Sequence, residues 1–273
     1  MSSDLYSRRI GESGERVVFL HGLFGQGRNF TSIAKALEPD FCSLLVDLPN
    51  HGHSAWTDHA DYRQMADAVA HLLQGDFAAE GPVHVVGHSM GGKVAMVLAL
   101  THPELVDRLV VVDISPMDTG NTGNGGEFEH LLDSLAGLDL DALTRRADAD
   151  DALAEPIPDP RVRGFLLQNL RQQDGRFGWQ ANLEVLRNDL LAIGAFPRFT
   201  TSFDHPTLWI AGETSPYIKP EHDAEMRRLF PRTTFVTIRG AGHWVHAEQP
   251  EAFTSALRTF LGAGRPVRRE HQP

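Results

Sequence analysis

One stretch constrains the fold of this chain more than any other. An apolar, β-branched run from Val83 leads into Gly87-His88-Ser89-Met90-Gly91, and a helix-forming segment follows. A Gly-x-Ser-x-Gly turn between a strand and a helix is typical of a nucleophile elbow, which raises a serine hydroxyl above the end of a sheet. The flanking glycines allow the strand and the helix to pack closely. The pattern therefore predicts Ser89 as a nucleophile, against the alternative of an ordinary glycine-rich turn.

Short apolar runs recur along the chain and alternate with helical patterns. Runs of this kind suit strands that are buried on both faces. They stand at 16–20, 42–46, 83–86, 109–112, 207–212 and 234–238. Between them, apolar residues recur at helical spacing, as in 61–73. Strands that alternate with helices predict an α/β fold with a mostly parallel, doubly wound sheet.

The alternation stops between Ile114 and Asp204. Three amphipathic helices are predicted there, with a polar Gly/Asn loop and no strand; the helices are at 131–143, 162–170 and 183–193 and the loop is at 119–126. We expect a helical cap, residues 117–204, inserted into a core made of residues 1–116 and 205–262. Such a cap would cover the carboxyl ends of the strands, where ligands bind in open α/β sheets. Residues 263–273 are rich in Arg and Pro, which predicts a disordered tail.

A serine hydroxyl is a weak nucleophile unless a base removes its proton, so the elbow requires a histidine. Of the fourteen histidines, His243 is the strongest candidate, because it follows the last apolar run and precedes a closing helix at 250–261. This position gives the chain order serine, acid, histidine that accompanies an elbow serine. We expect His246, one helical turn later, to be a partly buried surface histidine.

An acyl-transfer intermediate carries an alkoxide that needs backbone N–H donors already in place. The amide of Met90, directly after the nucleophile, is one candidate. The loop after the first apolar run supplies the other, with Leu23 the first choice and Phe24 the second. The alternative is that this loop is only a tight turn.

Composition limits the partners and the chemistry. Cys42 is the only cysteine, which excludes an intramolecular disulfide, and no Cys/His spacing resembles a zinc site, so we expect no metal. A formal net charge of −11 argues against nucleic acid or an anionic membrane surface as a partner. The sequence shows neither a secretory signal nor a membrane-spanning run, so we expect a cytoplasmic location. The oligomeric state stays open.

Four motifs together resemble the α/β-hydrolase superfamily, over nearly the whole chain. They are Leu20-His21-Gly22, the segment Asp47 to Ser54, Gly87 to Gly92, and Gly242-His243. Three segments are further similar to the YbfF-type acyl esterases and their mitochondrial relatives: His21 to Gly25, Val112 to Pro116 and Ser215 to Ile218. The resemblance implies an α/β-hydrolase fold and a serine esterase or thioesterase without a cofactor. Its substrates would be small-molecule esters or thioesters of short to medium acyl groups, cleaved through an acyl-enzyme.

Other activities on the same scaffold are alternatives. C–C bond hydrolases and cofactor-free haloperoxidases resemble this pattern closely, and a non-catalytic ligand receptor could keep the pocket. Dehalogenases and soluble epoxide hydrolases are disfavoured, because they place an aspartate at the elbow.

The acid of the triad departs from the commonest superfamily pattern, in which an aspartate stands within Gly-x-x-Asp after the strand that follows the cap. Ser215 occupies that place here, and a serine cannot supply the charge that orients the histidine. Asp113 directly follows the strand before the cap and should emerge at the same edge as Ser89 and His243. Glu213 is the rival acid.

Apolar side chains of the cap, together with the residue after His243, are predicted to line an acyl pocket. They are Phe128, Leu131, Phe165 and Trp244.

Overall fold

The structure, a computed structural model, describes residues 4–118 and 125–263. Seven strands form one sheet in the order β1-β3-β2-β4-β5-β8-β9. Their bounds are β1 (Ser7–Ile10), β2 (Glu15–Leu20), β3 (Phe41–Val46), β4 (Val83–His88), β5 (Val106–Val112), β8 (Thr207–Gly212) and β9 (Thr233–Ile238). All neighbouring pairs are parallel except β1 with β3. The predicted mostly parallel sheet is confirmed.

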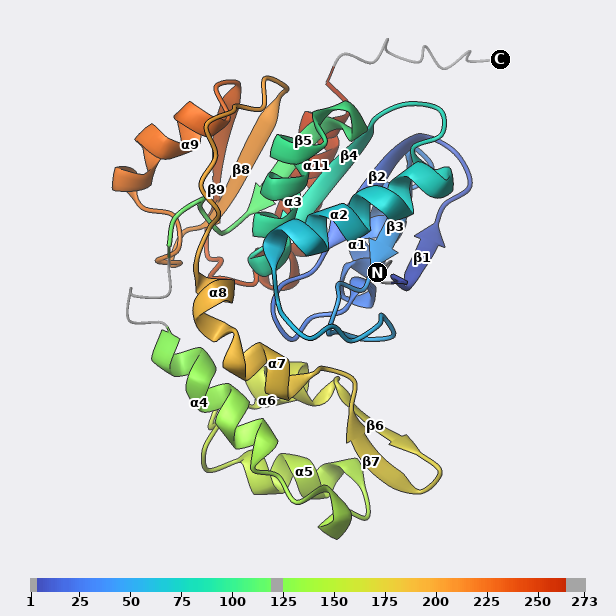
Figure 1. The fold of residues 1–273 in the computed structure, drawn as a ribbon, viewed down its shortest axis with the longest axis vertical. Coiled ribbons are helices and arrows are strands. Elements are labelled where there is room, and N and C mark those ends of the chain that lie inside the picture. Colours follow the sequence, from blue (N-terminus) through green and yellow to red (C-terminus); the bar gives the residue numbers. More distant parts are fainter. Residues whose placement is uncertain (1–3, 119–124, 264–273) are drawn as a thin grey trace.

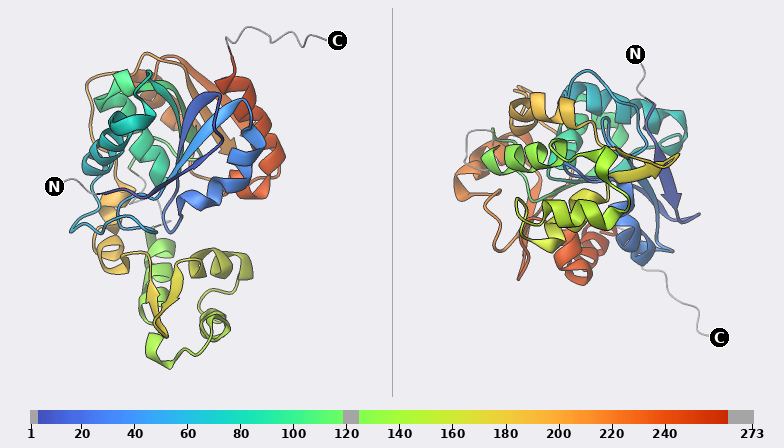
Figure 2. Two further views of the ribbon diagram at one scale, coloured as in Figure 1. Left: turned by 90° about the vertical axis from the view of Figure 1, so that its right-hand side faces the viewer. Right: turned by 90° about the horizontal axis from the view of Figure 1, so that it is seen from below.

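Helices cover both faces of the sheet (Figure 1). They are α1 (Thr31–Leu37), α2 (Tyr62–Leu72), α3 (Met90–Thr101), α9 (Asp223–Leu229), α10 (Val245–Glu248) and α11 (Pro250–Leu261). Along β2, Val18 and Leu20 pack with α2 and α3, whereas Val17 and Phe19 pack with α1 and α11. The side view in Figure 2 shows the sheet between these two pairs of helices. Side chains therefore alternate between two buried faces, which explains why the strands read as continuous apolar runs.

Several short helical turns complete the core. They are Gly27–Phe30, Leu73–Phe77, Pro103–Leu105 and Pro220–His222. Within the described ranges, every helix is too short or too polar to cross a bilayer.

The segment between β5 and β8, which we call the insertion, lies below the sheet in Figure 1. It contains α4 (Gly125–Ala136), the turn Leu140–Ala142, α5 (Arg146–Leu153), α6 (Pro160–Leu167), β6 (Leu170–Gln173), β7 (Arg176–Trp179), α7 (Leu183–Asn188) and α8 (Leu190–Gly194). Most of the predicted loop at 119–126 and all of the predicted tail except Ala263 lie outside the described residues.

The expectation of an insertion without strands is wrong, because β6 and β7 form an antiparallel hairpin. Its loop is Asp174-Gly175, and both residues have positive φ, 52° and 81°. An Asp-Gly pair with this backbone is typical of a two-residue hairpin turn. The Asp-Gly pair can be read in the sequence, but the strands on either side of it are polar and lack the apolar pattern that predicted the other strands.

The predicted helix bounds in the insertion are also partly wrong. The first helix ends at Ala136, before Gly137, and does not run to 143. The predicted helix at 183–193 is divided at Asp189 into α7 and α8, and α5 was not predicted.

Candidate active site

The elbow places Ser89 between β4 and α3 with φ 52° and ψ −118°. A non-glycine residue in this region is strained and persists only where the surroundings impose it. A Cβ at Gly87 would lie 2.2 Å from the carbonyl oxygen of Gly91, and one at Gly91 would lie 2.4 Å from that of Leu20. The close packing of strand and helix therefore requires glycine at both positions and raises Ser89 at the carboxyl end of β4.

The structure brings Ser89, His243 and Asp113 together. The Nε2 of His243 lies 3.0 Å from the Oγ of Ser89, and its Nδ1 lies 2.7 Å from the Oδ2 of Asp113. Asp113 directly follows β5 and is fully buried, while His243 stands in the loop after β9. The three residues thus meet at the carboxyl ends of the parallel strands β4, β5 and β9.

The carboxylate of Asp113 is fixed by two further donors. The backbone N–H of Gly212 donates to its Oδ1 at 3.0 Å, and the hydroxyl of Ser215 donates to its Oδ2. Ser215, which replaces the aspartate of the commonest pattern, therefore holds the acid in place; the sequence reasoning missed this role. The carboxylate of Glu213 instead accepts the backbone N–H of Gly240 at 2.9 Å.

The loop that carries His243 is held from several sides. The Nε2 of His88 donates to the carbonyl oxygen of His243 at 2.8 Å, and Tyr217 stacks on the His243 ring with centroids 4.2 Å apart. Burial lowers the pKa of His88 well below its usual value, so this ring is neutral. The carboxylate of Glu248 accepts the N–H of Trp244 at 3.2 Å. These contacts fix the imidazole between the serine and the acid.

The predicted oxyanion residues differ in what their amides do. The N–H of Phe24 donates to the Nε2 of His51 at 3.3 Å, so this amide is already engaged. Met90 begins α3, where the first N–H groups of a helix have no partner within it. Leu23 lies in the loop opposite and lines the cavity at Ser89.

Two buried histidines hold this loop. The Nε2 of His21 accepts the N–H of Leu48 at 2.9 Å, while its Nδ1 lies 2.8 Å from the carbonyl oxygen of Gly22. The Nδ1 of His51 faces the carbonyl oxygen of Pro49 at 3.0 Å. In both rings the proton must therefore sit on Nδ1, which makes them neutral. Burial lowers the pKa of His21 to about 4 and that of His51 to about 3.

The cavity at Ser89 is small and mostly apolar, with a volume of about 20 Å³. All four predicted pocket residues line it. The complete lining is Leu23, Phe24, His88, Ser89, Phe128, Leu131, Val162, Phe165, Leu166, His243 and Trp244. Such a lining suits an acyl group.

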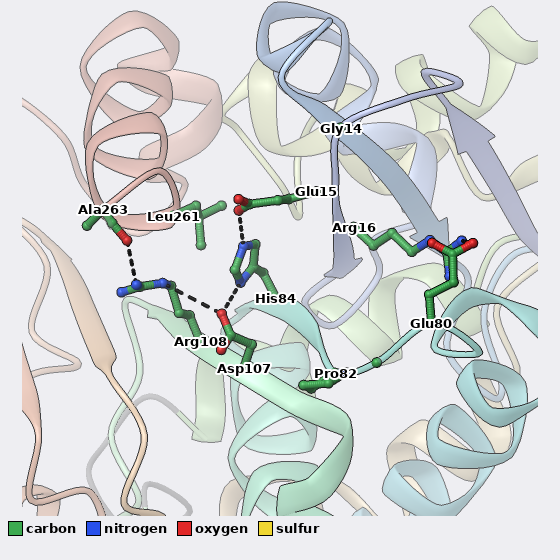
Figure 3. A pocket seen from close by; sticks show the side chains of 11 residues that line it. Gly14, Glu15, Arg16, Glu80, Pro82, His84, Asp107, Arg108, Leu261 and Ala263 are labelled. Carbon is green, nitrogen blue, oxygen red and sulfur yellow. Dashed lines mark hydrogen bonds and ion pairs between the residues drawn. The ribbon is translucent and has the colours of Figure 1, made fainter. Parts of the chain in front are cut away.

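A larger hollow of about 480 Å³ lies at the amino ends of β2, β4 and β5, and Figure 3 shows the side chains that line it. There His84 stands between Glu15, at 2.8 Å, and Asp107, at 3.3 Å. Its lining contains no serine, cysteine or threonine among the described residues. Nor do the described residues contain a cluster of three or more His, Cys, Asp or Glu side chains that could hold a metal ion. The smaller cavity, which contains Ser89 and His243, is therefore the candidate active site.

Known proteins resemble this chain in sequence and fold. Residues 15–250 match the family described as the alpha/beta hydrolase fold. The sn-1-specific diacylglycerol lipase ABHD11 of Danio rerio is 41% identical over 253 residues, covering 90% of this chain and 78% of that protein. Esterase YbfF of Escherichia coli is 33% identical over 245 residues, covering 90% and 92%. A solved marine microorganism esterase, 34% identical, superposes with a TM-score of 0.91 over 95% of this chain and 100% of its own. The chain belongs to the α/β-hydrolase fold family.

Proposed function

We propose that this protein is a serine hydrolase that cleaves carboxylic esters of short to medium acyl groups through an acyl-enzyme. The observation that carries the proposal is the continuous relay from the Oγ of Ser89 through His243 to Asp113, at 3.0 and 2.7 Å. The names of the relatives, esterase and lipase, support the same reaction class.

In the first half of the reaction, His243 takes the proton of Ser89 and the serine oxygen attacks the ester carbonyl carbon. Asp113 holds the imidazole in the required tautomer and stabilises the imidazolium that forms. The carbonyl oxygen becomes an alkoxide, and the amides of Leu23 and Met90 donate to it. We assign Leu23 ahead of Phe24 because the amide of Phe24 is engaged by His51.

In the second half, His243 returns the proton to the leaving alcohol oxygen and the carbonyl re-forms as an acyl ester of Ser89. Water then attacks this ester, with His243 as the base, and the acid product leaves. No cofactor takes part in these steps.

The insertion is proposed as a cap, residues 117–204, that sets acyl specificity. Its side chains Phe128, Leu131 and Phe165 line the cavity at Ser89, together with Trp244 from the core. Because these side chains are apolar and the cavity is small, short to medium acyl chains should be preferred.

Oxygen esters are the first choice of substrate, ahead of acyl-coenzyme A thioesters. Three arginines of the cap that could meet phosphates are each paired with an aspartate. The pairs are Arg145 with Asp148 at 2.8 Å, Arg161 with Asp159 at 2.9 Å and Arg163 with Asp150 at 2.9 Å. Paired guanidinium groups offer less net charge to an anionic leaving group.

Fluorophosphonate labelling tests the proposal, because covalent attachment requires an activated serine. The wild-type protein should be labelled on the peptide that contains Ser89 and should hydrolyse p-nitrophenyl butyrate. The variant Ser89→Ala should stay folded, remain unlabelled and lose hydrolysis. Absence of labelling in the wild type, or hydrolysis by a folded Ser89→Ala close to that of wild type, would overturn the proposal in favour of a ligand receptor or another chemistry.

A further inference from the structure

A buried ammonium group, that of Lys93, takes no part in the proposed mechanism. Lys93 stands four positions after Ser89 in α3, and its backbone N–H donates to the carbonyl oxygen of Ser89 at 3.1 Å. Its relative exposure is 1%, and it is the only charged residue of α3. Burying a charge costs free energy unless hydrogen bonds compensate for it. A lysine in a buried helix that carries no other charge therefore indicates a contact that requires the ammonium.

The Lys93 side chain ends at the segment by which the chain returns from the insertion to the core. Its Nζ donates to the carbonyl oxygens of Gly194, at 2.6 Å, and Ala195, at 3.0 Å. The hydroxyl of Tyr62, buried at the start of α2, donates to the carbonyl oxygen of Ile193 at 2.6 Å. The last carbonyl oxygens of a helix lack partners within it, and α8 ends at Gly194. Two buried side chains of the core therefore bind three consecutive carbonyl oxygens at the end of α8.

The segment that leads from β5 into the insertion also interacts with Lys93. Burial lowers the pKa of the Lys93 ammonium to about 7, and attraction by the carboxylate of Asp118 opposes this shift. Asp118 lies on this segment, between the end of β5 and the start of α4. The Nζ of Lys93 also lies 5.9 Å from the centroid of the Tyr62 ring, within the range of a cation–π contact. The ammonium thus interacts with both connections between the core and the insertion.

The end of α8 is coupled to the cavity at Ser89 through the insertion. Both α7 and α8 pack against α4, which carries Phe128 and Leu131. These two side chains line the cavity, whose volume of about 20 Å³ leaves room for about one water molecule. An ester can therefore reach Ser89 only when side chains of the insertion move away from it. For these side chains to return to the same place, one end of the insertion must stay fixed to the elbow.

We propose that Lys93 is a positioning residue, which together with Tyr62 forms a clamp that holds the end of α8 on the elbow helix α3 and so sets where the insertion lies over Ser89. The clamp is the fixed point about which α4 moves when an ester enters. The effect of the clamp on substrate binding rests on the proposed ester hydrolysis, whereas its mechanical role does not.

Hydrogen exchange measured by mass spectrometry tests the clamp without a substrate. Lys93→Met removes the ammonium and keeps an unbranched side chain, while Tyr62→Phe removes only the hydroxyl. The amides of α7 and α8 should exchange about tenfold faster than in the wild type in Lys93→Met and about threefold faster in Tyr62→Phe, the scale of a lost hydrogen bond to a charged and to a neutral donor. The amides of β4 should stay protected over the same labelling time.

The control is Ile33→Val, because Ile33 is buried on α1 at the other face of the sheet. This substitution lowers the stability of the fold through lost packing, without touching the clamp. The amides of α7 and α8 should therefore exchange in Ile33→Val as in the wild type.

Kinetics then test the positioning of the insertion. An octanoyl group is far larger than the cavity at Ser89, so its binding depends on where the insertion lies, and an acetyl group depends on this much less. Lys93→Met should raise KM for p-nitrophenyl octanoate about tenfold and leave KM for p-nitrophenyl acetate close to that of the wild type. The kcat values should not change, because the three residues of the triad belong to the core.

Equal exchange of α7 and α8 in Lys93→Met and Ile33→Val would overturn the proposal, because the Lys93 contact would then add only general stability. Faster exchange with an unchanged KM for the octanoate would overturn it too, since the clamp would then not set where the insertion lies over Ser89. If Lys93→Met fails to fold, wild-type exchange in Tyr62→Phe refutes the clamp by itself. Failure of the proposed function would look different: the wild type would hydrolyse neither ester, and the exchange result would still decide on the clamp.

Discussion

Acidification should weaken the fold through the neutral histidines that hold the oxyanion loop. Burial lowers the pKa of His51 to about 3 and that of His21 to about 4, from an ordinary value of 6.5. Each ring accepts a backbone N–H at its unprotonated Nε2. A proton on that atom would set two N–H groups against each other, so the native protein resists a proton that the unfolded chain accepts.

Proton linkage gives the direction and the magnitude of the change in the free energy of unfolding with pH. Below about pH 6.5 the unfolded chain binds more protons at these two sites than the native protein, so the free energy of unfolding falls as the pH falls. The stability that comes from keeping these two histidines neutral is fully present above about pH 6.5, and it is lost as the pH falls toward their pKa values in the folded protein. Between pH 7 and pH 5, each histidine should remove about 2 kcal/mol. Together they remove about 4 kcal/mol, a large part of the about 5 to 15 kcal/mol that stabilises a typical protein.

The assay is urea unfolding at pH 7, 6 and 5, followed by tryptophan fluorescence, for the wild type and His51→Gln. Glutamine keeps an oxygen that can accept the N–H of Phe24, and it does not titrate. The variant should lose about 2 kcal/mol less than the wild type between pH 7 and pH 5. Identical pH dependence in the two proteins would refute the reasoning, because His51 would then take up a proton equally well in both states.

Three further substitutions test the site and its supports. Asp113→Asn should lower kcat for p-nitrophenyl butyrate by about 10³ to 10⁴, the scale for a triad without its orienting charge, while Glu213→Gln should stay close to wild type; the reverse result would exchange the two assignments. Leu131→Ala enlarges the inner cavity and should move the preferred p-nitrophenyl ester toward longer acyl chains, and an unchanged chain-length profile would argue against the cap as the acyl site. The Nζ of Lys93 donates to two carbonyl oxygens at the end of α8, at 2.6 and 3.0 Å, so Lys93→Met should lower the free energy of unfolding in urea by about 1 to 3 kcal/mol. The exposed Lys35→Met is its control, and equal stability of the two variants would contradict the role of this contact.

The parts of the fold that could be predicted are those whose burial leaves a local pattern. Five strands are buried on both faces and read as apolar runs. The edge strand β9 has only Ile238 buried, but its β-branched and aromatic residues indicated a strand, whereas β1 offers a single apolar residue, Ile10, and escaped prediction. The hairpin of β6 and β7 also carries mostly exposed or half-buried side chains, so its turn was its only clear signal. Amphipathic spacing located helices in the insertion, but their ends depend on residues such as Gly137 and Asp189.

In the candidate site, too, some residues could be predicted from the sequence and some contacts could not. Ser89, Asp113 and His243 could be named because each directly follows a strand or stands in a recognisable turn. The support of Asp113 by Ser215 spans 102 positions, and the engagement of the Phe24 amide by His51 spans 27. Contacts between residues this far apart leave no periodic trace in the sequence, so the observation on which we propose Leu23 ahead of Phe24 could not be made from the sequence.

An acyl group on Ser89 is the intermediate on which the proposed mechanism depends, and intact-mass spectrometry can detect it. The protein would be mixed with excess p-nitrophenyl butyrate, quenched in acid within milliseconds and weighed, with Ser89→Ala treated in parallel. The mechanism predicts a mass increase of one butyryl group on the wild type, located on the peptide with Ser89, together with a burst of p-nitrophenol. Turnover without a burst and without any butyrylated protein, or the same adduct on Ser89→Ala, would contradict it.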